Sequence, residues 1–189
     1  LMLVSFIYGI AFFVYPAIWA YFGALRFGWS PTMIGVSLAA FGISMAVVQA
    51  TLVRPIIRAI GERNTVILGL LLDAGVFLLL GFVESGLFAI LLTPITALGS
   101  IVGPALQSIM SRAAADDQQG ELQGTLTSIN AVGMIIAPIV MTQIFWLFTS
   151  DNAPVYLPGA PFLLSTFLVL ICVGLFIPST KELAVGDET

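Results

Sequence analysis

The sequence contains no histidine and only one cysteine, Cys172, and these two shortages exclude several kinds of site. Without histidine there is no Ser–His–Asp triad, no zinc-binding helix motif and no imidazole proton relay. A single cysteine provides neither a disulfide nor a set of metal ligands. Cys172 lies within an apolar run, where we expect a small packing residue. We therefore expect neither a metal nor a cofactor.

Charge is also scarce, and this shortage defines the class of protein. Of 189 residues, 8% are charged and 59% are hydrophobic, whereas soluble domains carry about 25% charged residues. A soluble fold of this size has too little interior to bury so much apolar surface, so lipid is the expected solvent. The net charge of −4 argues against a nucleic-acid partner.

Long apolar segments predict the transmembrane spans. A hydrocarbon core of about 30 Å needs roughly 20 apolar helical residues. Six segments meet this length: 1–25, 32–52, 65–83, 87–110, 122–148 and 160–177. The sequence therefore predicts an all-α membrane protein, a six-transmembrane-helix bundle over residues 1–178. Residues 179–189 would form a short polar cytoplasmic tail.

The basic residues predict the orientation of this bundle, since cytoplasmic loops are enriched in arginine and lysine. The odd-numbered connections hold only Arg26. The second and fourth connections and the C-terminal segment hold the others: Arg54, Arg58, Arg63, Arg112 and Lys181. We expect these two connections and both termini to be cytoplasmic. Leu1 already lies in an apolar segment without a preceding basic region, so we expect a later part of a longer polypeptide rather than a signal peptide.

Asp73 is the most unusual residue within the predicted spans. It lies near the middle of the third span, where an unpaired carboxylate costs several kcal/mol. It must be protonated, paired, or facing a water-filled cavity. We favour a role in proton coupling or cation contact, and a structural hydrogen bond to a neighbouring helix is the alternative.

Other residues are candidates for the wall of a substrate cavity. Gln49 and Asn130 are polar residues within the second and fifth spans, and they either line a cavity or join helices by hydrogen bonds. Tyr8, Tyr15 and Trp19 share one face of the first span because they are seven and four residues apart. They form either an aromatic wall for a planar ligand or ordinary packing.

Four prolines fall inside the predicted helices: Pro16, Pro94, Pro104 and Pro138. Each removes a backbone hydrogen bond and favours a kink. Such breaks are frequent in transporters, in which bent helices line and gate a cavity.

Several stretches, in the same order along the chain, carry a family resemblance. These are residues 26–43, the triplet Gly61-Glu62-Arg63, and residues 104–112 and 119–124. They resemble the C-terminal half of the bacterial tetracycline/proton antiporters of the major facilitator superfamily. The resemblance extends over roughly residues 19–138, whereas the last helix matches only in hydropathy.

The resemblance implies a twelve-helix antiporter, of which this chain supplies helices seven to twelve. It places Asp73 where the family has an intramembrane aspartate important for transport, and Gln49 where the family has a glutamine. It also implies that a basic cytoplasmic loop makes breakable contacts favouring one access state. The gating candidates are Arg54, Arg58, Gly61, Glu62, Arg63 and Arg112. Setting the membrane topology is the alternative role of these arginines.

Four residues, at three places in the chain, depart from the family pattern. Met45 occupies the place of a histidine in the eighth helix, and Phe13 that of a glutamine in the seventh. Ala24-Leu25 replaces an acidic pair.

These observations predict half of a proton-coupled secondary transporter in a bacterial cytoplasmic membrane, exporting a drug or amphiphilic metabolite by alternating access. Its partners would be the lipid bilayer, an N-terminal six-helix half, protons and a small-molecule substrate. The alternative is a non-transporting membrane scaffold or assembly protein built on the same bundle. We expect no enzyme activity, because Asp73 is the single carboxylate within the spans and histidine is absent.

Overall fold

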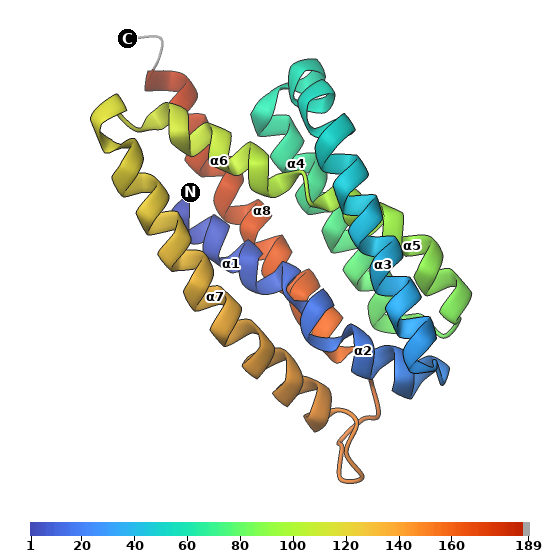
Figure 1. Ribbon diagram of the computed structural model, residues 1–189. Helices are drawn as coiled ribbons and strands as arrows, with labels where there is room; N and C mark the ends of the chain where they lie inside the picture. Colours follow the sequence, from blue (N-terminus) through green and yellow to red (C-terminus); the bar gives the residue numbers. More distant parts are fainter. Residues whose placement is uncertain (187–189) are drawn as a thin grey trace.

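The computed structural model describes the backbone of residues 1–186 and the side chains of residues 1–115 and 117–180. The described backbone is almost entirely helical (Figure 1). In chain order, the elements are α1 Met2–Phe12, α2 Val14–Phe27, α3 Pro31–Val47, a π-helical turn Val48–Leu52, α4 Val53–Phe82, α5 Gly86–Gly99, α6 Val102–Ala113, a 3-10 turn Asp116–Gln118, α7 Gln119–Leu147 and α8 Ala160–Gly186.

Five helical segments of the described chain are long and apolar enough to cross a membrane. They are Met2–Phe27, Pro31–Phe82, Gly86–Ala113, Gln119–Leu147 and Ala160–Thr180. The expected count of six is not confirmed, because the spans expected at 32–52 and 65–83 lie in one segment of 52 residues. If straight, a helix of this length would be about 78 Å long, more than twice the hydrocarbon core.

That long segment is bent within α4. Gly61 has φ 80° and ψ 161°, which is not a helical conformation and is rarely adopted by a residue with a side chain. Figure 1 shows α3 and the second part of α4 as two arms that run in opposite directions. The chain therefore reverses direction near Gly61 although helical structure continues on both sides.

Two further helices are interrupted where prolines remove hydrogen bonds, as the sequence predicted for Pro16 and Pro104. The first span breaks at Phe13, three residues before Pro16. Gly86–Ala113 breaks at Ser100 and Ile101, shortly before Pro104. In each case the proline has no N–H for the carbonyl four residues earlier. Pro94 and Pro138 lie within α5 and α7, which continue through them.

The connections between helices lie at two opposite ends of the molecule, which we name the Gly61 end and the Trp29 end. The Gly61 end contains the turn within α4, the α6–α7 connection and the C-terminal part of α8 (Figure 1). The Trp29 end contains the α2–α3, α4–α5 and α7–α8 connections. At the Trp29 end, Gly28 ends α2 with φ 66°, and the Ser30 and Ser85 hydroxyls accept from backbone amides that begin α3 and α5.

Aromatic packing connects α2 and α8 toward the Trp29 end of the bundle. The rings of Tyr15 and Trp19 on α2 stack at 4.3 Å, and Phe22 meets Phe162 of α8 at 5.1 Å. The residue before α8 lies so close to α4 that a side chain at Gly159 would overlap the backbone of Gly81. Many large apolar side chains remain exposed on the outer faces, as expected where lipid replaces water.

Candidate functional site

Asp73 lies in the interior of the bundle, on the second arm of α4. Its side chain has no exposed surface. The Tyr8 hydroxyl of α1 lies 2.9 Å from Asp73 Oδ2, to which it donates, and 3.1 Å from the backbone carbonyl of Gly99 in α5. Among the described residues, Asp73 Oδ1 has no hydrogen-bond partner. A buried carboxyl group with one satisfied oxygen is costly in a membrane interior.

Gly99 provides the space for this carboxyl group. A Cβ atom at Gly99 would overlap Oδ1, Oδ2 and Cγ of Asp73. Gly99 is also the last residue of α5, directly before the break at Ser100 and Ile101. Three separate elements, α1, α4 and the end of α5, therefore meet at one buried acidic group.

A polar cavity of about 350 Å³ lies between α1, the π-helical turn, α6 and α7. Ser5 reaches it from α1, one turn before Tyr8, and Gly103 and Pro104 reach it from α6. We name it the amide cavity because of its hydrogen-bonding side chains: Ser5, Gln49, Gln107, Gln123, Thr127 and Asn130. The Gln107 amide donates to the Gln123 carbonyl oxygen across the α6–α7 interface at 3.1 Å.

The structure thus brings Gln49 and Asn130 to the same cavity, although 81 positions separate them in the sequence. Gln49 lies in the π-helical turn between α3 and α4, and such turns are frequent at functional sites. Each amide side chain can donate and accept hydrogen bonds. The side chains that line the cavity are uncharged, so it presents hydrogen bonds to a ligand rather than a counter-charge.

The three aromatic candidates of the first span are buried in the bundle. Tyr8 contacts Asp73, the Tyr15 hydroxyl lies 3.3 Å from the Thr93 hydroxyl, and Trp19 Nε1 donates to the Ser37 hydroxyl at 2.8 Å. None of the three lines the amide cavity. They satisfy buried polar groups within the bundle, which suits aromatic residues with a polar atom.

A separate apolar pocket of about 260 Å³ lies at the break between α1 and α2. Its lining includes Phe12, Phe13 and Tyr15 from the first span and Met45 from α3. Met45 and Phe13 are two of the positions at which the sequence analysis expected a departure from the family pattern. Both side chains contribute apolar surface to one pocket.

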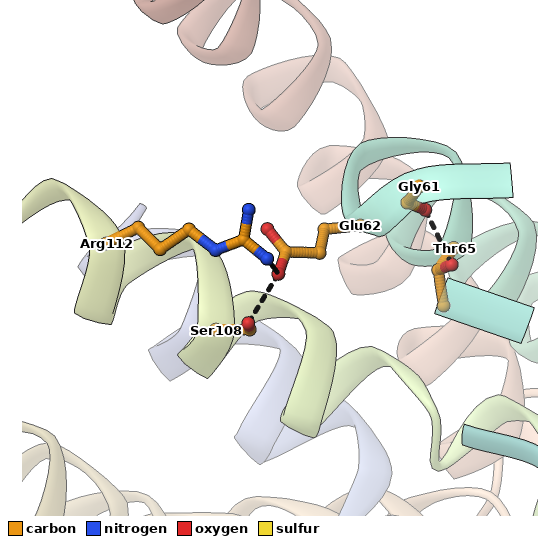
Figure 2. Close-up of polar contacts among 5 residues, drawn as sticks. All are labelled: Gly61, Glu62, Thr65, Ser108 and Arg112. Carbon is orange, nitrogen blue, oxygen red and sulfur yellow. Dashed lines mark hydrogen bonds and ion pairs between the residues drawn. The ribbon is translucent and has the colours of Figure 1, made fainter. Parts of the chain in front are cut away.

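The Gly61 end carries a polar contact between α4 and α6 (Figure 2). Glu62 accepts hydrogen bonds from the Ser108 hydroxyl and from Arg112, whose Nη2 lies 2.6 Å from Glu62 Oε1. The Glu62 side chain is 12% exposed and that of Arg112 is 74% exposed. We name this contact the Glu62 ion pair.

The other three arginines of the Gly61 end differ in their surroundings. Arg63 Nε donates to the Thr180 hydroxyl at 2.9 Å and so connects α4 to α8. Arg54 and Arg58 are exposed on the first arm of α4. The loop candidates are therefore not one cluster: Glu62 and Arg112 pair with each other, and Arg63 contacts α8.

Sequence reasoning did not identify Ser108 or the pairing of Tyr8 with Asp73. Ser108 is a small polar residue one turn before Arg112, and this i, i+4 spacing was the available signal. Tyr8 and Asp73 are 65 residues apart, and local periodicity does not indicate which helices will pack together.

The architecture defines a class, a multi-pass α-helical membrane protein with a buried carboxyl group and a polar cavity between its helices. Residues 1–188 match the sequence profile of the Major Facilitator Superfamily, and the chain belongs to this family. The chain is 38% identical over 174 residues to the class C tetracycline resistance protein of Escherichia coli, covering 92% of this chain and 42% of that protein.

Two other relatives also match most of this chain over less than half of their own length. The class G tetracycline resistance protein of Vibrio anguillarum is 35% identical, over 83% of this chain and 39% of that protein. The crystal structure of the human organic anion transporter MFSD10 (TETRAN) superposes with a TM-score of 0.81 at 27% identity, over 93% of this chain and 39% of that one. The chain thus spans about two fifths of the length of these relatives.

Proposed function

We propose that this chain is the C-terminal half of a proton-coupled secondary transporter that exports a drug or another amphiphilic small molecule. The observation that carries the proposal is Asp73, a carboxyl group with no exposed surface in the interior of a bundle of the transporter superfamily. Acidic groups inside membrane spans are rare, and those that occur commonly mark proton or ion pathways. The proposed function includes no catalytic step.

In this proposal the bundle crosses the membrane six times. The segment Pro31–Phe82 would cross once on each side of the turn at Gly61, giving two crossings from one of the five apolar segments. An N-terminal six-helix half, in the same polypeptide or in a separate chain, would complete the transporter. This is consistent with a chain that spans about two fifths of its relatives.

The transport cycle would use Asp73 and the amide cavity for different tasks. Asp73 would bind and release the coupling proton, and Gln49 and Asn130 would contact substrate in the amide cavity. The two halves would rock between inward-facing and outward-facing states. The Glu62 ion pair and the Arg63 contact would form and break between these states, and Arg54 and Arg58 would keep the Gly61 end cytoplasmic.

The chemistry of the cavity favours a substrate rich in carbonyl and hydroxyl groups. Its uncharged lining offers several amide donors and acceptors. Two of the relatives are named as tetracycline resistance proteins, and a tetracycline-like amphiphile fits this chemistry. Tyr8, Tyr15 and Trp19 would hold neighbouring helices in place, and Tyr15 also borders the apolar pocket next to Met45.

We place the transporter in a bacterial cytoplasmic membrane, with both termini of this segment in the cytoplasm. The basic residues of the Gly61 end support this orientation. The scaffold alternative receives no support from the relatives, which are named as resistance proteins and as a transporter.

The decisive experiment compares two aspartates in the full-length protein. Inside-out membrane vesicles would carry the wild type, Asp73→Asn or the control Asp151→Asn, which lies in an exposed turn between α7 and α8. We expect proton-driven tetracycline uptake in the wild type and in Asp151→Asn. Asp73→Asn should reduce the uptake at least tenfold, because asparagine cannot bind and release a proton.

Substrate binding distinguishes coupling from simple loss of the protein. Asp73→Asn should still bind ligand in detergent with an affinity within a few-fold of the wild type. Unchanged proton-driven uptake by Asp73→Asn would refute the coupling role. A wild type that transports none of a panel of amphiphilic drugs would favour the scaffold alternative.

A further inference from the structure

The Tyr8 hydroxyl lies between two acceptors that belong to different helices. It is 2.9 Å from Asp73 Oδ2 on α4 and 3.1 Å from the Gly99 carbonyl at the end of α5. A phenol has a single O–H and can also accept a hydrogen bond. Both distances suit a full hydrogen bond, but one proton cannot serve both acceptors fully at the same time.

The two protonation states of Asp73 resolve this competition differently. When Asp73 is ionised, its carboxylate is the stronger acceptor and takes the Tyr8 proton, because charge-assisted hydrogen bonds are the stronger ones. When Asp73 is protonated, its own O–H can donate to the Tyr8 oxygen. The Tyr8 O–H then donates to the Gly99 carbonyl instead. In this arrangement the O–H groups of both Asp73 and Tyr8 donate a hydrogen bond.

The position of Gly99 gives this rearrangement a mechanical consequence. Gly99 precedes the break at Ser100 and Ile101, which separates α5 from α6. Carbonyls in the last turn of a helix lack following helical amides and take other donors. A hydrogen bond that forms and breaks at this carbonyl therefore acts on the junction of two helical pieces.

Helix α6 connects this junction to the rest of the proposed site. It supplies Gln107 to the amide cavity, and Ser108 and Arg112 to the Glu62 ion pair. A change in the angle between α5 and α6 would move all three side chains together. The amide cavity and the Glu62 ion pair thus share α6, which begins directly after the junction that Gly99 precedes.

We propose that Tyr8 is a positioning residue whose hydroxyl transmits the protonation state of Asp73 to the α5–α6 break. This inference rests on the proposed proton-binding role of Asp73 and adds the route by which a bound proton changes the shape of the cavity. The proton enters at Asp73 Oδ2, Tyr8 exchanges acceptors without gaining or losing a proton, and Gly99 gains a donor.

The groups that face the pair are few in the described chain. Cys172 from α8 is the other titratable side chain beside Tyr8, and its thiol donates to the carbonyl of Val4. Helix α5 presents the backbone of Gly99, where a Cβ would overlap the carboxyl group. The Tyr8 ring packs against Phe12 at a centroid distance of 5.7 Å, and this contact persists when only the hydroxyl is removed.

The test measures the angle of α6 as a function of pH. Spin labels at Asn64→Cys on α4 and Ala113→Cys on α6, both exposed positions, report the distance between the two helices in the full-length protein. Cys172 is buried and stays unlabelled. We expect the wild type to exchange between two distance populations as the pH changes. In Tyr8→Phe this pH dependence should be lost.

A matched control is available on the same span. Tyr15→Phe removes an equally buried hydroxyl, which contacts Thr93 and not an acidic group, and it should keep the pH dependence. Retained pH dependence in Tyr8→Phe would overturn the transmission by Tyr8. Its loss in both tyrosine variants would show a merely structural effect and would overturn it as well.

The Asp73→Asn variant separates this inference from the proposed function. If Asp73→Asn keeps the pH-dependent distance change, the proton role of Asp73 fails. If Asp73→Asn loses it and Tyr8→Phe keeps it, only the Tyr8 inference fails.

Should Tyr8→Phe not reach the membrane, 3-fluorotyrosine at position 8 preserves the hydroxyl and alters its donor strength. The midpoint pH of the distance change must then move, whereas 3-fluorotyrosine at position 15 leaves it in place.

Discussion

At the scale of single residues, the strength of the Glu62 ion pair depends on how much water reaches each partner. Arg112 is 74% exposed and remains hydrated, whereas Glu62 is 12% exposed. Pairs with an exposed partner contribute about 0–1 kcal/mol, but a mostly buried carboxylate that loses its partner costs about 1–3 kcal/mol. The burial of Glu62 therefore decides the cost of breaking the pair.

This asymmetry predicts a double-mutant cycle. Arg112→Gln leaves the Glu62 carboxylate with the Ser108 hydroxyl alone and should lower the free energy of unfolding by about 1 kcal/mol. Adding Glu62→Gln removes the buried charge and should recover much of this loss. Denaturant unfolding in mild detergent measures Arg112→Gln, Glu62→Gln and the double variant.

The ion pair at the Trp29 end is the control for this cycle. Arg26 contacts Glu84 at 3.2 Å, and the Glu84 side chain is 86% exposed. Glu84→Gln should change the free energy of unfolding by less than about 0.5 kcal/mol. A loss in Glu84→Gln as large as that in Arg112→Gln would contradict the argument from burial.

The residue scale also marks where sequence reasoning ends. Asp73 and Gln49 were identifiable because polar residues inside apolar spans are costly, and because the resemblance placed both. The partner Tyr8 was named only as one of three aromatic candidates, since its contact depends on how α1 packs against α4. Helix packing in three dimensions, rather than periodicity along the chain, creates the acidic site.

At the scale of elements, the turn within α4 is the feature that allows one long helical segment to double back. Gly61 has φ 80° and ψ 161°, and no atom outside its immediate chain neighbourhood lies within 4 Å of a Cβ built there. A substitution at Gly61 thus meets no steric neighbour. Its cost arises from the backbone conformation alone, which is about 1–3 kcal/mol for a residue with a side chain.

Two alanine substitutions in α4 separate backbone strain from other effects. Gly61→Ala should lower the free energy of unfolding by about 1–3 kcal/mol. Gly75→Ala has equally open space but a helical backbone, and should be neutral or stabilising by up to about 1 kcal/mol, because alanine is the better helix former. Equal stability of the two variants in denaturant unfolding would show that a side chain at position 61 causes no backbone strain.

The elements were predictable where composition alone decides them. The apolar segments and the breaks near Pro16 and Pro104 follow from hydropathy and from the missing proline N–H. The sequence placed a connection at residues 54–64, but the structure forms helix there on both sides of Gly61. Sequence reasoning also missed the π-helical turn around Gln49. A one-residue change of helical register has no signature in hydropathy.

At the scale of the whole molecule, the two ends of the bundle differ in charge and in the connections they carry. The connections of the Gly61 end hold Arg54, Arg58, Arg63 and Arg112, whereas the Trp29 end holds Arg26. If Pro31–Phe82 crosses the membrane twice, the start of α3 and the start of α5 lie on one side of the membrane. A single crossing of this segment would place them on opposite sides.

Labelling of introduced cysteines from one side of the membrane tests this topology and its orientation together. Ser30→Cys and Ser85→Cys lie at exposed positions of the Trp29 end, and Asn64→Cys and Ala113→Cys at exposed positions of the Gly61 end. In intact cells, a membrane-impermeant maleimide should label the first pair and leave the second unlabelled. Inside-out vesicles should give the reverse pattern, because arginine-rich connections remain cytoplasmic.

The labelling pattern distinguishes each way in which the topology can be wrong. Ser30→Cys and Ser85→Cys labelled from opposite sides would mean that Pro31–Phe82 crosses once and that the bundle has five crossings. If the second pair is labelled in cells and the first pair in inside-out vesicles, the bundle has six crossings in the inverted orientation. Only the expected pattern places the Glu62 ion pair on the cytoplasmic side, where the proposed transport cycle requires it to open and close.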